Sequence, residues 1–237
     1  MKRKHQSSIA LGIAASVLML AAQGAMAQGS GDGPVYKPPV RGAPASRVGG
    51  GSRGVGTELP RVYVLAPADI GFTTKAKPDL FWFASDNTSA KITLTVYTED
   101  PSKPLLEQSL PAVAAPGIQR IKLSEFGLEL QPRTEYRWRV LLVDEAPNRP
   151  AARAVASGTI QRTNAWSKLQ ARLQNEGSDQ LARAKVYAEE GLWYDALENI
   201  GQALDADKGN ALARKNRAAL AEQVGLTEVG QFEAGGK

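Results

Sequence analysis

Between residues 61 and 162, apolar and polar residues alternate in short segments that turn residues separate. The clearest segment is 91–97, where Ile92, Leu94 and Val96 share one face. Alternation at a period of two predicts strands that bury one side. Seven strands are expected, at residues 61–65, 78–84, 91–97, 105–110, 117–123, 136–142 and 155–162.

The sixth segment begins with a pattern that is typical of an immunoglobulin-like sandwich. Leu130 and Pro132 precede Tyr136, as in a tyrosine corner, where the Tyr hydroxyl bonds to backbone a few residues upstream. We therefore expect an all-β sandwich of the immunoglobulin or fibronectin III type over residues 59–163. Its core is expected to contain the aromatic residues Trp82, Tyr136 and Trp138.

From residue 164 the apolar spacing becomes that of an α-helix. The pattern predicts four helices: one capped by Asn164 that stops near Gly177, one capped by Ser178 or Asp179 that ends at Gly191, one from Trp193 to Leu204, and one from Ala211 to about Val224. The tail at 227–237 is expected to be flexible.

Residues 164–226 resemble a tetratricopeptide repeat, because Ala184, Gly191 and Leu192 recur about 34 residues later as Ala218, Gly225 and Leu226. One repeat and a half are expected, since the chain ends before a second full hairpin. Such a short array cannot bury its own apolar face. We expect it to pack on the sandwich through the Trp166 helix, or to complete the array of a partner.

The start of the chain is typical of a secretory signal peptide. Three basic residues precede an apolar run at 9–22 and a small-x-small site at 25–27. We expect cleavage after Ala27, a periplasmic or secreted protein, and no transmembrane span after cleavage. Residues 28–58 are rich in Gly, Pro and Arg and are predicted to be a disordered linker.

Composition excludes several kinds of active site. The chain has no cysteine and one histidine, His5, which lies in the predicted signal peptide. Nucleophilic sites that need His, and zinc sites built on His or Cys, are therefore excluded from the mature chain. Of the net charge of +5, three charges lie at residues 2–4 and two in the linker, so the remainder is neutral and no nucleic-acid partner is expected.

Carboxylate and calcium chemistry are the remaining candidates. The densest acidic pairs are Glu99-Asp100, Asp144-Glu145 and Glu189-Glu190, but neighbours on a helix point apart and the other two pairs lie at turns. A calcium site at Asp205, Asp207 and Asn210 lacks the closing Glu. We expect no catalytic residue, no metal, no cofactor and no enzymatic activity.

Four aromatic residues are candidate partner contacts: Phe81, Phe83, Trp193 and Tyr194. Packing is favoured for Trp193 and Tyr194, which occupy repeat-consensus positions. Phe81 and Phe83 alternate with the buried face of their strand, so they need a cover. The chain's own helices are favoured over a partner as that cover.

Several stretches in this order resemble a bacterial family known as domain of unknown function 928: residues 47–54, 80–83, 116–118, 136–138 and 187–197. The resemblance spans about residues 47–226. It implies export and this layout, but it provides no functional residues.

These observations favour a non-enzymatic adaptor or scaffold that binds another envelope or secreted protein through the sandwich edge and the helical hairpin. The alternative is a module that binds cell-envelope glycans through exposed aromatic residues and the basic linker. A carboxylate-only hydrolase has the least support, because no site for it can be located. Partner identity and oligomeric state stay open.

Overall fold

The computed structural model describes residues 33–39, 59–145 and 151–235, which hold eight strands and five α-helices. The predicted signal peptide at 1–27, and the linker outside residues 33–39, fall beyond the described ranges. In those ranges no helix has the length and apolar character needed to cross a membrane.

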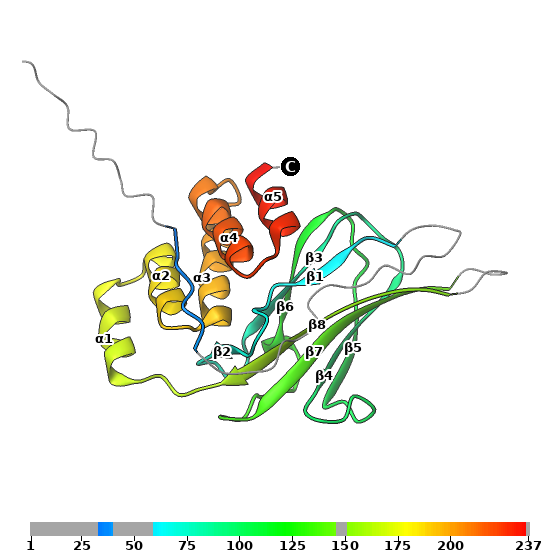
Figure 1. Cartoon of the computed structure of the whole chain (residues 1–237), viewed down its shortest axis with the longest axis horizontal. Helices are drawn as coiled ribbons and strands as arrows, with labels where there is room; N and C mark the ends of the chain where they lie inside the picture. The colour runs from blue at the N-terminus through cyan, green and yellow to red at the C-terminus, as the bar shows by residue number, and fades with distance from the viewer. Residues whose placement is uncertain (1–32, 40–58, 146–150, 236–237) are drawn as a thin grey trace, which may run out of the picture. The chain divides into compact units, whose positions relative to one another are not determined.

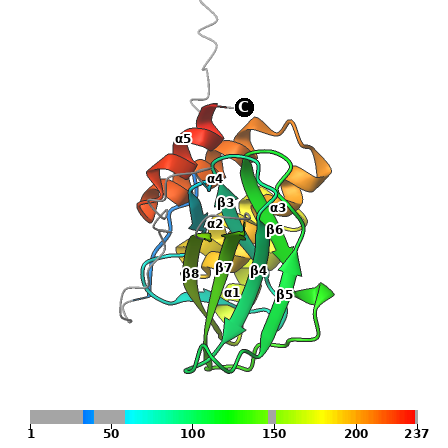
Figure 2. The ribbon, with the colours of Figure 1, turned by 90° about the vertical axis from the view of Figure 1, so that its right-hand side faces the viewer.

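The strands form two sheets (Figures 1 and 2). The three-stranded sheet has the order β1-β3-β6 and consists of β1 (Val62–Val64), β3 (Asp79–Ala84) and β6 (Gly117–Lys122). The five-stranded sheet has the order β2-β8-β7-β4-β5 and consists of β2 (Gly71–Thr73), β8 (Ala152–Arg162), β7 (Glu135–Asp144), β4 (Lys91–Tyr97) and β5 (Leu106–Leu110). The seven predicted strands are present, and β2 is an addition that pairs with β8 in parallel. The other strand pairs are antiparallel.

Alternation in the strands builds the core between the sheets. Val96 of β4 lies opposite Trp138 of β7, and Leu94 lies opposite Val140, so buried side chains face buried side chains. Trp138 is 0% exposed and Trp82 is 2% exposed.

The predicted hydrogen bond of Tyr136 is confirmed. Its hydroxyl accepts from the Gln131 backbone N–H at 2.9 Å, and the ring is 3% exposed. The bond therefore ties the start of β7 to the loop before it.

Five helices follow the sheets: α1 (Ser167–Asn175), α2 (Gln180–Glu189), α3 (Trp193–Ala206), α4 (Ala211–Gln223) and α5 (Thr227–Gly235). Asp179 caps α2 by accepting hydrogen bonds from the N–H groups of Leu181 and Ala182. The prediction of Asn164 as the first cap was wrong, because α1 begins at Ser167 with Trp166 in the cap position.

The prediction of a flexible tail was also wrong, since α5 occupies residues 227–235. Tertiary contacts hold this helix in place. Glu228 accepts hydrogen bonds from the Arg61 side chain and from the Tyr63 hydroxyl at 2.6 Å. Phe232 packs edge-on against Phe83, with the ring centroids 5.1 Å apart.

Helix α3, rather than the Trp166 helix, joins the helices to the sheets (Figure 1). Trp166 is 36% exposed, and α1 packs on α2. All six residues of β3 are buried, so the outer side of the three-stranded sheet needs a cover of helices. One of its faces lies in the core between the sheets and the other lies under α3 and α5.

Candidate functional site

A short N-terminal segment, residues 33–39, lies on the helices and is called the strap (Figure 1, blue). The side-chain amide of Gln223 binds its backbone twice: Oε1 accepts from the Tyr36 N–H at 2.8 Å, and Nε2 donates to the Pro34 carbonyl at 2.8 Å. The Lys37 N–H donates to the carbonyl of Ala188 at 3.1 Å. For these residues the prediction of a disordered linker was wrong, because α2 and α4 satisfy their backbone groups.

Tyr36 anchors the strap. Its ring is 8% exposed and packs edge-on against Trp193, with centroids 4.9 Å apart. Burial raises the pKa of Tyr36, so its hydroxyl stays protonated. Gly191 permits the close approach, because it has a φ of +76° and a Cβ there would lie 2.9 Å from the Lys37 carbonyl oxygen.

Two buried polar side-chain atoms lie at the strap. The Tyr36 hydroxyl and Asn216 Oδ1 are buried and have no hydrogen-bond partner within the described ranges. Gly33 lies beside Asn216, since a Cβ there would be 3.6 Å from Oδ1.

Beneath the strap, three consecutive residues of α3 fix the helices to the sheets. Trp193 Nε1 donates to the Leu65 carbonyl at 2.8 Å. The Tyr194 hydroxyl accepts from Trp138 Nε1 at 2.9 Å and donates to the Thr159 carbonyl at 3.0 Å.

Asp195 completes this set by accepting from the Thr74 N–H at 2.9 Å and from the Thr74 hydroxyl at 2.6 Å. Burial raises the pKa of Asp195, although the hydrogen bonds from Thr74 oppose that shift.

Ion pairs continue the same interface toward the C-terminal end of α3. Lys75 pairs with Glu198 at 2.5 Å, and Arg120 of β6 pairs with both Asp79 and Asp205. Burial, followed by the nearby charge of Glu198, raises the pKa of Asp79. Buried Glu198 and exposed Asp205 thus hold α3 on the sheets, while Asp79 fixes Arg120 within the three-stranded sheet.

The calcium candidate is not assembled as a ligand set. Asp205 binds Arg120, and Asp207 accepts from the Gly209 N–H at 2.8 Å. Throughout the described residues, no three His, Cys, Asp or Glu side chains gather in a way that could hold a metal ion. The pair Glu189-Glu190 does converge, because both carboxylates bind Arg172 of α1 at 2.5 and 2.6 Å.

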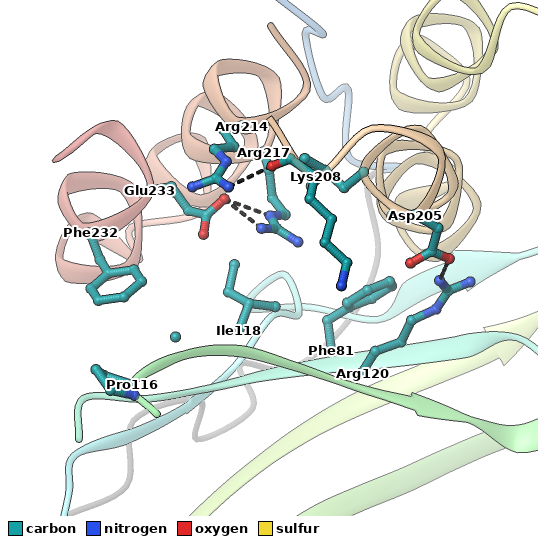
Figure 3. A pocket seen from close by; sticks show the side chains of 13 residues that line it. Phe81, Pro116, Ile118, Arg120, Asp205, Lys208, Arg214, Arg217, Phe232 and Glu233 are labelled. Atoms are coloured by element: carbon teal, nitrogen blue, oxygen red, sulfur yellow. Dashed lines mark hydrogen bonds and ion pairs between the residues drawn. The ribbon is translucent and has the colours of Figure 1, made fainter. Parts of the chain in front are cut away.

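A second candidate site is a pocket of about 330 Å³ between β3, β6 and the helices α3, α4 and α5 (Figure 3). Its walls carry four cationic side chains and two carboxylates: Arg120, Lys208, Arg214, Arg217, Asp205 and Glu233. Phe81, Ile118 and Phe232 provide its apolar side.

The structure buries all four aromatic residues that the sequence offered as partner contacts: Phe81, Phe83, Trp193 and Tyr194 are each 0–1% exposed. Phe81 lies under Gly201 of α3, where a Cβ would be 3.0 Å from its ring, and Phe83 lies under Phe232. None of them provides a free surface, so their assignment as partner contacts is corrected. The core candidates Trp82, Tyr136 and Trp138 are each at most 3% exposed.

Sequence reasoning missed Tyr36 and Gln223 at the strap, and Lys208 and Arg214 at the pocket. One signal for the strap was present, because Tyr36 is followed by Lys37 and two prolines in a segment otherwise rich in glycine. Consecutive prolines favour an extended, preorganised backbone of the kind that binding surfaces recognise. The pocket left no local signal, because its residues come from five separate elements.

Comparison with known proteins adds the family. No curated protein matches the sequence. A family profile matches residues 48–233, which is most of the chain and includes both sheets, helices α1 to α4 and most of α5. The chain therefore belongs to the family described as Domain of Unknown Function (DUF928).

Proposed function

We propose that the protein is an exported, non-enzymatic adaptor that binds an extended segment of another envelope or secreted protein on the helical face now covered by the strap. One observation carries this proposal. The face holds the extended backbone of the strap through the side-chain amide of Gln223, which accepts from Tyr36 and donates to Pro34, and through the Ala188 carbonyl, which accepts from Lys37; Tyr36 is the one aromatic anchor. Backbone bonds with a single anchoring side chain are a common mode of peptide recognition.

The helices are proposed to be tetratricopeptide-like, with two hairpins rather than one and a half. The pairs α2–α3 and α4–α5 each pack closely. Gly191 and Gly225 take left-handed φ angles of +76° and +79° at equivalent turns. Such arrays present extended binding surfaces formed by successive helices, and the strap touches α2 and α4, the first helix of each hairpin.

The sheets are proposed to be an immunoglobulin- or fibronectin III-like sandwich. Their strand orders support this, since β1-β3-β6 corresponds to strands A, B and E, and β4-β7-β8 corresponds to strands C, F and G. The Tyr136 hydrogen bond to Gln131 is a further support. In this proposal the sandwich is the support on which α3 fixes the binding face.

The other hypotheses have less support. Glycan binding was based on exposed aromatic residues, and the four candidates are buried. Hydrolysis with carboxylates alone has no support from Asp79, Asp195 or Glu198, whose contacts are structural. Export rests on the N-terminal pattern at residues 1–27.

The test uses the mature chain with the strap weakened by three substitutions, Pro34→Gly, Val35→Ser and Tyr36→Ser. A fluorescent synthetic peptide with the sequence of residues 33–39 is the probe. We expect saturable binding to the substituted chain and at least about tenfold weaker binding to the unchanged chain, where the attached strap competes at high effective concentration.

Gln223→Ala in the substituted chain should weaken peptide binding at least about tenfold, because two hydrogen bonds are lost. Gln170→Ala, on the exposed side of α1, is the matched control and should change nothing. A peptide that binds equally with and without Gln223, or that does not bind the substituted chain, would refute the proposal. A partner from envelope extract should compete with the same peptide.

A further inference from the structure

The pocket beside α5 shares no contact residue with the strap face, so its role is a separate question. Two of its cations are neutralised by neighbours. Arg120 pairs with Asp79 and Asp205, and Arg217 pairs with Glu233 at 2.7 Å.

The other two cations, Lys208 and Arg214, have no carboxylate partner among the residues that the structure describes. The Arg214 guanidinium donates to the Lys208 carbonyl at 2.6 Å and forms no ion pair in the described part of the chain. Among these residues the Lys208 ammonium has no hydrogen-bond or ion-pair partner either, and it extends into the pocket toward Phe81 (Figure 3). With Asp79 counted as a partner of Arg120, four cations stand against three carboxylates, so an excess of positive charge remains.

The opposite side of the pocket is apolar. Phe81 has the Arg120 guanidinium 5.7 Å from its ring centroid, and Figure 3 shows Ile118 between Phe81 and Phe232. A pocket of about 330 Å³ is at the small end of the range for small-molecule sites. Apolar walls with a few converging polar groups are the usual character of such sites.

We propose that this pocket binds a small organic acid, with its carboxylate or phosphate held by Lys208 and Arg214 and its apolar body against the partly exposed side chains of Ile118 and Phe232. A guanidinium presents paired N–H donors that match both carboxylate and phosphate, while the ammonium adds a point charge. An inorganic anion should bind more weakly than an organic acid, because it leaves the apolar wall exposed to water.

The test is a titration of the mature chain, followed by NMR shifts of the backbone amides of Gly117, Ile118 and Gly201. Benzoate and phenyl phosphate probe the two kinds of anion. Inorganic phosphate and benzyl alcohol are half-probes that keep only the charge or only the ring. At least one of the full probes, benzoate or phenyl phosphate, should bind saturably. Each half-probe should bind with an affinity at least about tenfold lower.

Arg214→Gln and Lys208→Gln should each weaken the full probe about tenfold or more, by removing a charge-assisted hydrogen bond. Lys168→Gln on exposed α1 removes the same charge elsewhere and should leave binding unchanged. Lys208 lies in an exposed turn, so its substitution stays informative even if the Arg214 variant folds poorly. Absence of binding by both full probes, equal binding of benzyl alcohol, or a Lys208 variant that matches the Lys168 control would each overturn the proposal.

Discussion

Tyr194→Phe is the substitution that most directly tests how the helices are held on the sheets. The Tyr194 side chain is 0% exposed, and its hydroxyl links Trp138 Nε1 at 2.9 Å to the Thr159 carbonyl at 3.0 Å. Phenylalanine keeps the ring and removes only the oxygen. Trp138, itself 0% exposed, then has an indole N–H with no acceptor, and the Thr159 carbonyl loses a donor.

An unsatisfied buried donor costs about 1–3 kcal/mol, and the carbonyl adds about 1 kcal/mol because it keeps its second lone pair. The free energy of unfolding should therefore fall by about 2–4 kcal/mol. For a chain of this size that corresponds to a thermal midpoint roughly 4–16 °C lower. Urea unfolding followed by far-UV circular dichroism measures the loss without relying on indole fluorescence, which the substitution itself changes.

Tyr97→Phe is the matched control. The Tyr97 hydroxyl has no hydrogen-bond partner in the described ranges, and the ring is partly exposed beside Arg139. Its free energy of unfolding should stay within about 0.5 kcal/mol of the unchanged protein. If Tyr194→Phe were no more destabilising than Tyr97→Phe, the hydroxyl bridge would not stabilise the interface and the reasoning would fail.

Two further predictions concern the same interface. Gly71→Ala would place a Cβ 2.5 Å from the Tyr194 ring, so it should lower the free energy of unfolding, measured in urea, by about 1–3 kcal/mol. The control is Gly127→Ala, whose Cβ would meet no atom within 4 Å and should not lower it. Equal effects of the two would contradict the close approach. Burial raises the pKa of Asp195, so the folded state holds this proton more tightly than the unfolded state, and the resulting stability is lost as the pH rises through the raised pKa. The stability of the unchanged protein relative to Asp195→Asn, measured as urea midpoints, should therefore decline as the pH rises above about 4, and parallel profiles would refute this.

Local sequence signals were enough for most of the secondary structure. Alternation in β4 and β7 is strong because one face of each strand is buried. The sequence pattern did not predict β2, because three residues are too few to show a period. The position of β2 depends on its parallel partner β8 and on the Tyr194 ring, which packs against Gly71.

Helix α5 was not predicted from the sequence for a different reason. Gly230 and Gly235 lower its intrinsic helix propensity, so the sequence alone favours a frayed tail. The contacts of Glu228 with Arg61 and of Phe232 with Phe83 outweigh that preference. They join residues about 150 or more positions apart in the sequence, which no local pattern reveals.

The aromatic candidates illustrate how far such reasoning reaches for a site. The pattern of β3 correctly required a cover for Phe81 and Phe83, and the helices provide it. The pattern could not show that Gly201 and Phe232 are the covering residues. It also could not show that a pocket remains beside them, because that space depends on where α3 and α5 come to rest.

Trp193 connects the proposed binding face to the stability of the whole unit. One side of its indole meets the Tyr36 ring, while its N–H holds the Leu65 carbonyl just after β1. A partner that displaced the strap without an aromatic anchor would uncover a ring on which the docking of α3 depends. A partner that presents its own aromatic residue keeps that ring buried, and binding then adds to the stability of the folded chain. For the proposed adaptor role, this contact predicts that a bound segment carries an aromatic residue at the position of Tyr36.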